Sequence, residues 1–237
     1  MKKLFVIACL VSSALFLISG LSASAASADA DNQKKLNIVD DTYVSVGAGI
    51  VAQYFSKKDD FRKGSYPGFK GDIDVKYAAG LQANAEFNLS KFLALNLPVG
   101  INPGYRFQYL NVERKYTATN IMTNQSSELK QKFDYLNHIG YIDFLLPVGA
   151  SKYLVLGAET GCGLSTFKYT VSGTGISKST KSVNGIVVPL GVFLDWGADG
   201  FGGRIGYDYI ISKYSKLNGS KPSMDGHQLY INARYAF

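Results

Sequence analysis

Two histidines, His138 and His227, are the residues of this chain best suited to acid–base catalysis. Catalysis by a serine nucleophile requires a base within hydrogen-bond reach of the hydroxyl, and Ser223 and Asp225 lie close enough in sequence to His227 to form such a group. Neither histidine is followed two positions later by a serine, and a structural or loop histidine is the ordinary explanation. The sequence therefore predicts no catalytic residues, with a triad around His227 kept as an alternative.

Metal and phosphate sites have little support in the sequence. Cys162 and the two histidines do not reach the ligand count of a usual metal site. The run from Gly173 to Lys178 superficially resembles a phosphate-binding loop, but Ser177 stands where that motif needs glycine, and a strand rather than a helix is predicted to follow. We expect no metal and no cofactor.

Basic residues gather in stretches that we expect to be loops. The chain has 25 Lys and Arg against 18 Asp and Glu, with a formal net charge of +7. Loops with this excess attract anionic groups such as phosphates and acidic sugars. The predicted basic loop residues are Lys57, Lys58, Arg62, Lys63, Lys70, Lys178, Lys181, Lys216 and Lys221.

The elements that position these residues are β-strands, because apolar and polar residues alternate over long stretches. From Ile73 to Leu89 the odd-numbered positions are all apolar and the even-numbered ones mostly polar or small. A period of two places one set on each face of a strand, and a helix cannot produce it. The same pattern predicts eight strands, at 42–55, 71–89, 92–112, 128–148, 152–169, 182–196, 201–213 and 226–237.

The connections alternate between very short turns and long polar loops. The long loops are expected at 56–70, 113–127, 170–181 and 214–225. This layout is typical of outer-membrane barrels, which have turns in the periplasm and loops outside. Lipid cannot hydrogen-bond a free strand edge, so the last strand must pair with the first. The predicted fold is all-β, an eight-stranded antiparallel transmembrane β-barrel with up-and-down meander order, and strands longer than the bilayer should project above it.

The two ends of the chain carry export and assembly patterns. Lys2 and Lys3 precede an apolar stretch, and Ala25, Ala28 and Ala30 are candidate cleavage positions, so residues 1–25 are predicted to be a signal peptide. Residues 26–41 would form a short periplasmic N-terminal segment, and 42–237 the barrel. The last strand ends in an alternating pattern that resembles the insertion signal read by the barrel assembly machinery. Its members are Leu229, Ile231, Ala233, Tyr235 and Phe237.

Taken together, the export pattern, the loop rhythm and the terminal strand resemble the small outer-membrane β-barrel superfamily, which includes the OmpA transmembrane domain, OmpX and the opacity-type surface proteins. The resemblance implies a protein of the bacterial outer membrane. Some small barrels of this kind modify lipid A with His, Ser and acidic residues near the outer rim. We therefore keep a lipid A-modifying enzyme as one alternative.

An eight-stranded barrel is narrow enough for side chains to fill its interior. Unpaired charges are costly away from water, so charges of inward parity should pair. We predict an ion-pair network near the periplasmic end formed by Glu86, Asp143, Asp195, Arg204 and Arg234. The simpler alternative is that these charges are separately solvated at the barrel mouth. Further interior charges are expected at Lys76, Arg106, Glu159 and Asp208.

These patterns predict a non-enzymatic surface protein that contributes to envelope integrity and displays basic loops for adhesion. Expected partners are outer-membrane lipid and lipopolysaccharide, the assembly machinery, and a host surface receptor or glycan, whereas nucleic acid is not expected. A narrow pore for small solutes or ions is a second functional class.

Overall fold

The computed structural model describes residues 43–57, 61–62, 69–71, 74–93, 99–148, 154–173, 176–198, 200–217 and 219–237. The expected signal peptide, the segment at 26–41 and the loop residues Lys58 and Lys63 lie outside the described residues. These expectations stay predictions. Among the described residues, no helix is both long and apolar enough to cross a membrane.

The described chain is almost entirely β-strand. Its long strands are β1 (Val44–Phe55), β3 (Tyr77–Phe87), β4 (Gly100–Asn120), β5 (Ser126–Pro147), β6 (Leu154–Gly173), β7 (Ile176–Ala198), β8 (Phe201–Tyr214) and β9 (Gly226–Ala236). A short strand, β2 (Phe69–Gly71), pairs with the end of β4, and a one-turn helix, α2 (Leu89–Phe92), follows β3.

The eight long strands close into a barrel. Each pairs antiparallel with its neighbours in the chain, and β1 pairs with β9 along its whole length. At the seam the Tyr43 amide donates to the Phe237 carbonyl at 2.8 Å, and the Phe237 amide donates to the Val44 carbonyl at 2.8 Å. No long strand is left as a free barrel edge, as a bilayer requires. The predicted eight-stranded, closed, up-and-down barrel is confirmed.

Apolar side chains cover the outside of this barrel. Its interior holds buried polar and charged side chains together with a cluster of buried apolar ones, such as Phe133, Tyr135 and Phe167. Leu81 and Leu229 on the outer face are 63% and 60% exposed, whereas Gln108 on the inner face has no exposed surface. Water-soluble proteins show the opposite arrangement. The outer face therefore suits lipid.

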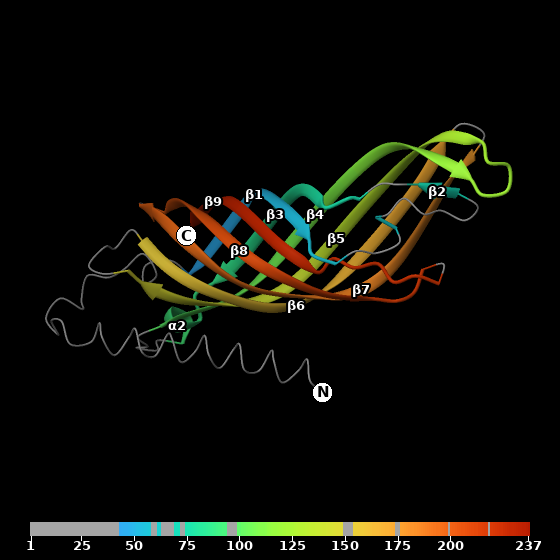
Figure 1. Ribbon diagram of the computed structural model, residues 1–237. Coiled ribbons are helices and arrows are strands. Elements are labelled where there is room, and N and C mark those ends of the chain that lie inside the picture. Colours follow the sequence, from blue (N-terminus) through green and yellow to red (C-terminus); the bar gives the residue numbers. More distant parts are fainter. Residues whose placement is uncertain are drawn as a thin grey trace, which may run out of the picture.

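Four strands continue past the barrel at one end. β4, β5, β6 and β7 extend there into a projecting sheet (Figure 1), which we call the outer sheet and which comprises 112–120, 126–133, 169–173 and 176–184. The expectation of long loops at 113–127 and 170–181 is therefore wrong, because most of these residues pair as strands. On β4, β5 and β6 one face of the outer sheet is buried, as at Tyr116, Leu129 and Val171, whereas the other face carries mainly charged and polar residues. The apolar outward face that marks a membrane strand is therefore lost there, although the strand pairing continues.

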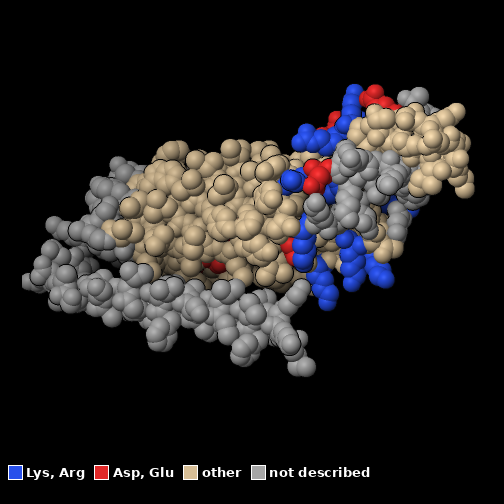
Figure 2. Space-filling view, in the orientation of Figure 1, with Lys and Arg blue, Asp and Glu red and all other residues tan. Residues whose placement is uncertain are grey.

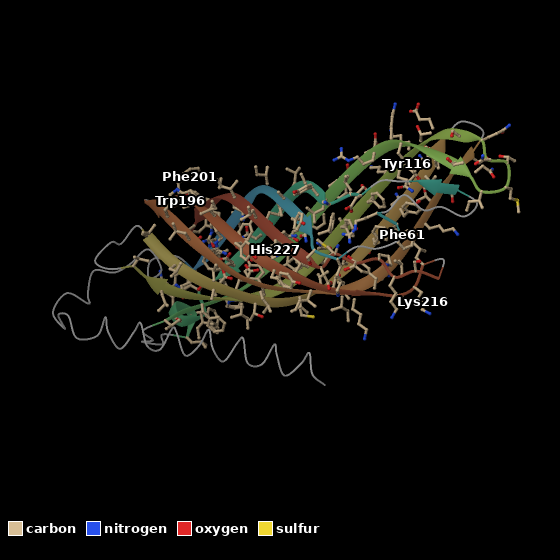
Figure 3. The ribbon with its side chains drawn as sticks, viewed as in Figure 1. Phe61, Tyr116, Trp196, Phe201, Lys216 and His227 are labelled. Atoms are coloured by element: carbon tan, nitrogen blue, oxygen red, sulfur yellow. The ribbon has the colours of Figure 1, made fainter. Side chains whose placement is uncertain are left out.

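The two ends of the barrel carry different side chains. Trp196 and Phe201 lie at the end away from the outer sheet, and Phe61, Tyr116 and Lys216 lie toward the sheet, with His227 between them (Figure 3). Trp196 and Phe201 are both exposed on the outer face, as expected of an aromatic girdle at a lipid interface. We call the outer-sheet end the outer end.

Candidate functional site

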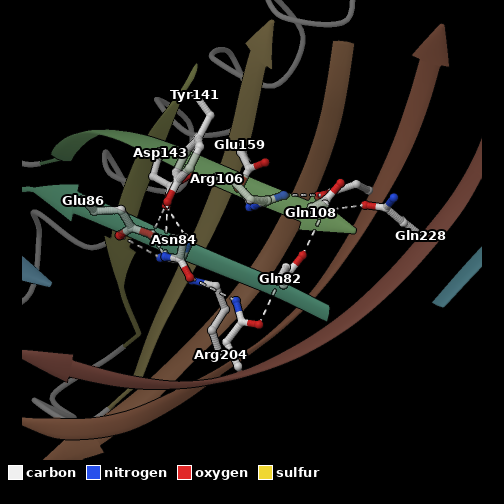
Figure 4. Close-up of polar contacts among 12 residues, drawn as sticks. Gln82, Asn84, Glu86, Arg106, Gln108, Tyr141, Asp143, Glu159, Arg204 and Gln228 are labelled. Carbon is white, nitrogen blue, oxygen red and sulfur yellow. Dashed lines mark hydrogen bonds and ion pairs between the residues drawn. The ribbon is translucent and has the colours of Figure 1, made fainter. Parts of the chain in front are cut away.

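The barrel lining contains a buried ion cluster centred on Arg204 (Figure 4). Arg204 pairs with Asp195 close to the turn between β7 and β8, which is the end away from the outer sheet. The Arg204 Nη1 atom lies 2.6 Å from the Asp143 Oδ2 atom and 2.9 Å from the Glu86 Oε1 atom, and its Nε donates to the Asp195 Oδ1 atom at 2.6 Å. The guanidinium also lies over the Phe193 ring, 3.7 Å from its centroid. One buried cation thus contacts three carboxylates.

Arg234 extends the same cluster from β9. Its Nη2 donates to the Glu86 Oε2 atom at 2.6 Å and to the Ser45 hydroxyl at 2.7 Å, and its Nη1 contacts Asp195. The Tyr141 hydroxyl donates to Glu86 at 2.7 Å. The structure therefore brings together all five residues that alternation placed at this end, and it does so inside the lining rather than at a solvated mouth.

A second buried cluster surrounds Arg106 at the middle of the barrel. Arg106 contacts Glu159, and its Nη1 lies 2.9 Å from the Asp208 Oδ2 atom. The guanidinium also lies 4.9 Å and 4.8 Å from the ring centroids of Tyr141 and Tyr230. These three charged residues are interior, where their parity put them.

Lys76 is not part of the lining, so that expectation is wrong. Its side chain is half exposed, and its Nζ lies 3.6 Å from the Asp74 Oδ2 atom. Strand β3 begins only at Tyr77, and Lys76 and Tyr77 are both exposed, although Val75 and Ala78 on either side are buried. The alternation breaks at this point, so counting back from the strand places Lys76 on the wrong face.

Buried amide side chains connect the two ends of the lining. Gln228 donates to Gln53 at 2.8 Å, and Gln108 donates to Gln228 and to Gln82 at 3.0 and 2.9 Å. Inward parity could have marked these amides from the sequence, but their partners depend on strand register. This series of hydrogen bonds continues toward the Arg204 cluster, from Gln82 to Asn232, from Asn232 to Asn84 and from Asn84 to Glu86. Hydrogen-bonded side chains therefore occupy the lining from the middle of the barrel to the ion cluster around Arg204.

The outer mouth of the barrel is closed by loop residues, including one that we expected to be displayed. Arg62 is 2% exposed, its Nη2 donates to the Lys57 carbonyl, and its guanidinium lies 4.1 Å from the centroid of the Phe55 ring. The adjacent Phe61 packs edge-on against Phe167, with 5.6 Å between ring centroids. Arg62 is thus a buried mouth residue and not a basic loop residue open to a partner.

Asp225 ties the fourth loop to this mouth. Its Oδ1 accepts from the Ser212 amide and hydroxyl, both at 2.7 Å, and its Oδ2 accepts from Lys57. Burial opposes ionisation of this carboxyl, but the hydrogen bonds from Lys57 and Ser212 outweigh it and hold the pKa of Asp225 below its usual value. The carboxylate is therefore structural, and it is not aimed at His227.

Neither histidine is paired with a serine in the described part of the chain. The His138 Nδ1 atom lies 2.5 Å from the Tyr105 hydroxyl, and the His227 Nδ1 atom lies 2.5 Å from the Tyr207 hydroxyl. The Ser223 hydroxyl accepts from the Asp225 amide. The triad considered around His227 is not assembled. Within the described residues there is also no group of three or more side chains able to hold a metal ion.

On the face that Figure 2 shows, basic side chains gather across the outer end, between the apolar barrel and the tip of the outer sheet. Lys57, Lys178, Lys181, Lys216 and Lys221 belong to this group and are exposed, as expected. Lys70 lies in β2. Strand residues that the loop-based prediction omitted complete what we call the basic belt. They are Arg114, Lys115, Lys130, Lys132, Lys168 and Lys213.

A closed eight-stranded barrel with an apolar outer surface and a filled interior defines the class of fold: a small antiparallel β-barrel whose outer surface suits lipid. Solved structures with a similar fold include outer-membrane proteins. They include Ail, the attachment invasion locus protein of Yersinia pestis, in complex with the heparin analogue sucrose octasulfate (16% identity, TM-score 0.47, 83% of this chain and 99% of that one). Neisserial surface protein A has 16% identity and a TM-score of 0.37 over 82% and 96% of the two chains. The outer membrane protease OmpT from Escherichia coli has 12% identity and a TM-score of 0.42 over 86% and 99%. No family model and no curated protein sequence matches this chain.

Proposed function

We propose that this protein is a non-enzymatic surface barrel of the bacterial outer membrane, which contributes to envelope integrity and presents its basic belt to anionic partners. The observation that carries the proposal is an excess of unneutralised positive charge at the outer end. In the part of the chain that the structure describes, several exposed lysines have no carboxylate within ion-pair distance. They are Lys168, Lys178, Lys213, Lys216 and Lys221.

The position of the belt favours two kinds of anion. Charges on a protein surface act over about 8–10 Å at physiological salt, so lysines directly above the apolar band can reach the phosphates of neighbouring lipopolysaccharide. The outer sheet carries further lysines beyond this level, where acidic glycans of a host surface can approach. The first contact would support envelope integrity, and the second would support adhesion.

The adhesion proposal can be tested with two sets of lysine variants, one unpaired and one ion-paired. The first set replaces the five unpaired lysines by glutamine. The control set replaces Lys115, Lys130 and Lys132, which are paired with Glu128, Glu113 and Asp134 at 3.8, 2.8 and 3.4 Å. Whole cells that display each variant would be measured for binding to host cells and to an immobilised sulfated polysaccharide.

We expect the unpaired set to lose most binding and the control set to retain it, with binding falling as salt is raised. Within the described chain the unpaired set breaks no ion pair, and the exposed pairs broken in the control set contribute at most about 1 kcal/mol each, so both sets should still fold. Equal binding by wild-type cells and by cells with the unpaired set replaced would exclude adhesion through the belt.

The non-enzymatic part of the proposal is supported by the hydrogen bonds of the two histidines, which go to tyrosines instead of a serine. Mass spectra of lipid A from cells with and without the protein should be identical. A mass change that requires the intact protein would replace this proposal with the lipid A-modifying alternative.

A further inference from the structure

A hollow of about 570 Å³ opens on the outside of the barrel near its outer end. It lies where β3 begins and β4 continues into the outer sheet: β4 pairs with β3 only as far as Asn111, and within the described residues its pairing with β2 starts at Ala118. Its volume falls within the roughly 300–1,000 Å³ typical of small-molecule sites. We call it the outer groove, and the lining residues used below are Tyr54, Tyr77, Arg114, Tyr207, His227 and Leu229.

Aromatic rings from four strands meet in the outer groove. The ring centroids of Tyr54 and Tyr77 are 5.2 Å apart, those of Tyr54 and His227 are 6.1 Å apart, and those of Tyr207 and His227 are 5.9 Å apart. All four side chains are exposed. Rings spread around a barrel would only anchor it in the interface, whereas adjoining rings around a hollow provide flat faces for the C–H groups of a sugar and hydroxyls for its polar groups.

The outer groove also contains one cation that is free to bind an anion. Glu113 lines the groove but is engaged by Lys130, with 2.8 Å between the Nζ and Oε1 atoms. In the described part of the chain, Arg114 has no carboxylate partner. A guanidinium recognises a phosphate group with two parallel hydrogen bonds, and it does so more strongly where the surroundings are partly apolar.

The groove is continuous with the lipid-facing surface below it. Leu229 lines its lower wall, and Leu229 and Leu81 are among the most exposed apolar residues of the outer face. Acyl chains would pack along these residues while a headgroup occupied the ring-lined hollow. The pattern from the membrane outward is therefore apolar surface, then aromatic rings, then a cation.

We propose that the outer groove binds a phosphorylated glycolipid of the outer leaflet, with a sugar ring of the headgroup against Tyr54, Tyr77 and Tyr207, and a phosphate on Arg114. The inference rests on the membrane placement in the proposed function, but not on adhesion. It assigns a specific lipid site, whereas the basic belt attracts anions only through its overall positive charge. A phospholipid with one anionic phosphate has no sugar for the rings to contact, so the site should prefer the glycolipid.

The test measures binding of purified bis-phosphorylated lipid A and of phosphatidylglycerol to the folded full chain in detergent, by native mass spectrometry. Two groove variants, Arg114→Gln and Tyr77→Leu, are compared with matched controls outside the groove. Lys115→Gln removes the adjacent, ion-paired cation, and Tyr105→Leu removes a tyrosine of the outer face that is exposed like Tyr77 but lies outside the groove. Heat-dependent mobility on gels would verify that each variant is folded.

We expect each groove variant to bind lipid A about tenfold more weakly than wild type, with unchanged binding by the two controls. Lipid A that lacks the phosphate bound by Arg114 should bind wild type and Arg114→Gln equally weakly, because the arginine then has no phosphate to contact. Equal losses in groove and control variants, or equal affinity of wild type for phosphatidylglycerol and lipid A, would each overturn the proposal.

The same variants separate this inference from the adhesion proposal. Cells that carry Arg114→Gln or Tyr77→Leu should still bind the sulfated polysaccharide, because the unpaired lysines of the basic belt are intact. Loss of lipid A binding without loss of adhesion supports a distinct groove. Retained lipid A binding in both groove variants refutes the groove, whatever the adhesion assay shows.

Discussion

Replacing Arg204 by methionine should test whether the buried ion cluster holds the barrel together. Methionine keeps much of the apolar packing over the Phe193 ring, but it removes the cation from Glu86, Asp143 and Asp195. Breaking a buried ion pair costs roughly 3–5 kcal/mol, mainly because a charge is left buried without a partner.

The magnitude follows from what remains after the substitution. Arg234 still contacts Glu86 and Asp195, so Asp143 is the carboxylate that loses its contacting cation. We therefore count the cost once and expect the free energy of unfolding to fall by about 3–5 kcal/mol. Five carboxyl groups already share three guanidinium groups in the lining, so no spare cation is available to take over.

The assay is reversible urea unfolding of the barrel in phospholipid vesicles. With a urea dependence of about 1–3 kcal/mol per molar, the midpoint should fall by at least roughly 1 M. Lys130→Met, which breaks an exposed pair with Glu113, is the control and should cost about 1 kcal/mol or less. Adding Asp143→Asn to Arg204→Met should recover part of the loss, because it removes the stranded charge. A midpoint for Arg204→Met equal to that of the control would refute the reasoning.

Four further outcomes are expected. Gly191→Ala should destabilise the barrel by about 1–3 kcal/mol in the same urea assay, because a Cβ there would lie 1.9 Å from the Asp208 Oδ1 atom; an unchanged midpoint would contradict this close packing. Because the pKa of Asp225 lies below its usual 3.8, its stabilising effect is complete above about pH 4 and is lost as the pH falls through the folded-state pKa. Hydrogen exchange of the Ser212 amide, corrected for intrinsic rates, should therefore accelerate only at lower pH, and acceleration already between pH 7 and 5 would be the opposite result. The purified barrel should give no steady conductance in a planar bilayer, because side chains fill its lining; sustained open-channel currents would instead support the pore. The fluorescence of Trp196, the one tryptophan of the chain, should be quenched most strongly by lipids labelled near the headgroup. Strongest quenching by labels at the bilayer centre would show that this end of the barrel does not lie at the lipid interface.

Most of the barrel was predictable from the sequence, because strand alternation is a local property. A period of two assigns each side chain to a face without knowledge of the partner strand, so Glu86, Arg204 and Arg234 could be placed in the lining in advance. The prediction failed where that local rule stops. Lys76 lies beyond a break in the alternation, and the outer sheet lacks the apolar outward face of a membrane strand.

Other features depended on contacts between segments that are distant in sequence. Nothing in the local sequence distinguishes Arg62 from an exposed loop cation, but in the fold it packs over the Phe55 ring. Arg114 becomes part of a groove only because β3 begins beside it. The hydrogen bonds of Tyr207 with His227 are likewise set by the register between β8 and β9.

The sequence by itself determined the class of fold, the number of barrel strands and the sign of the charge at the outer end, since each depends on composition or on residues close together in the chain. The tertiary structure alone decided which cation meets which carboxylate, how the mouth is closed and where the outer groove lies. The physical reason is that strand register and curvature bring side chains together across more than a hundred residues, as for Glu86 and Arg204, and no local pattern encodes that distance.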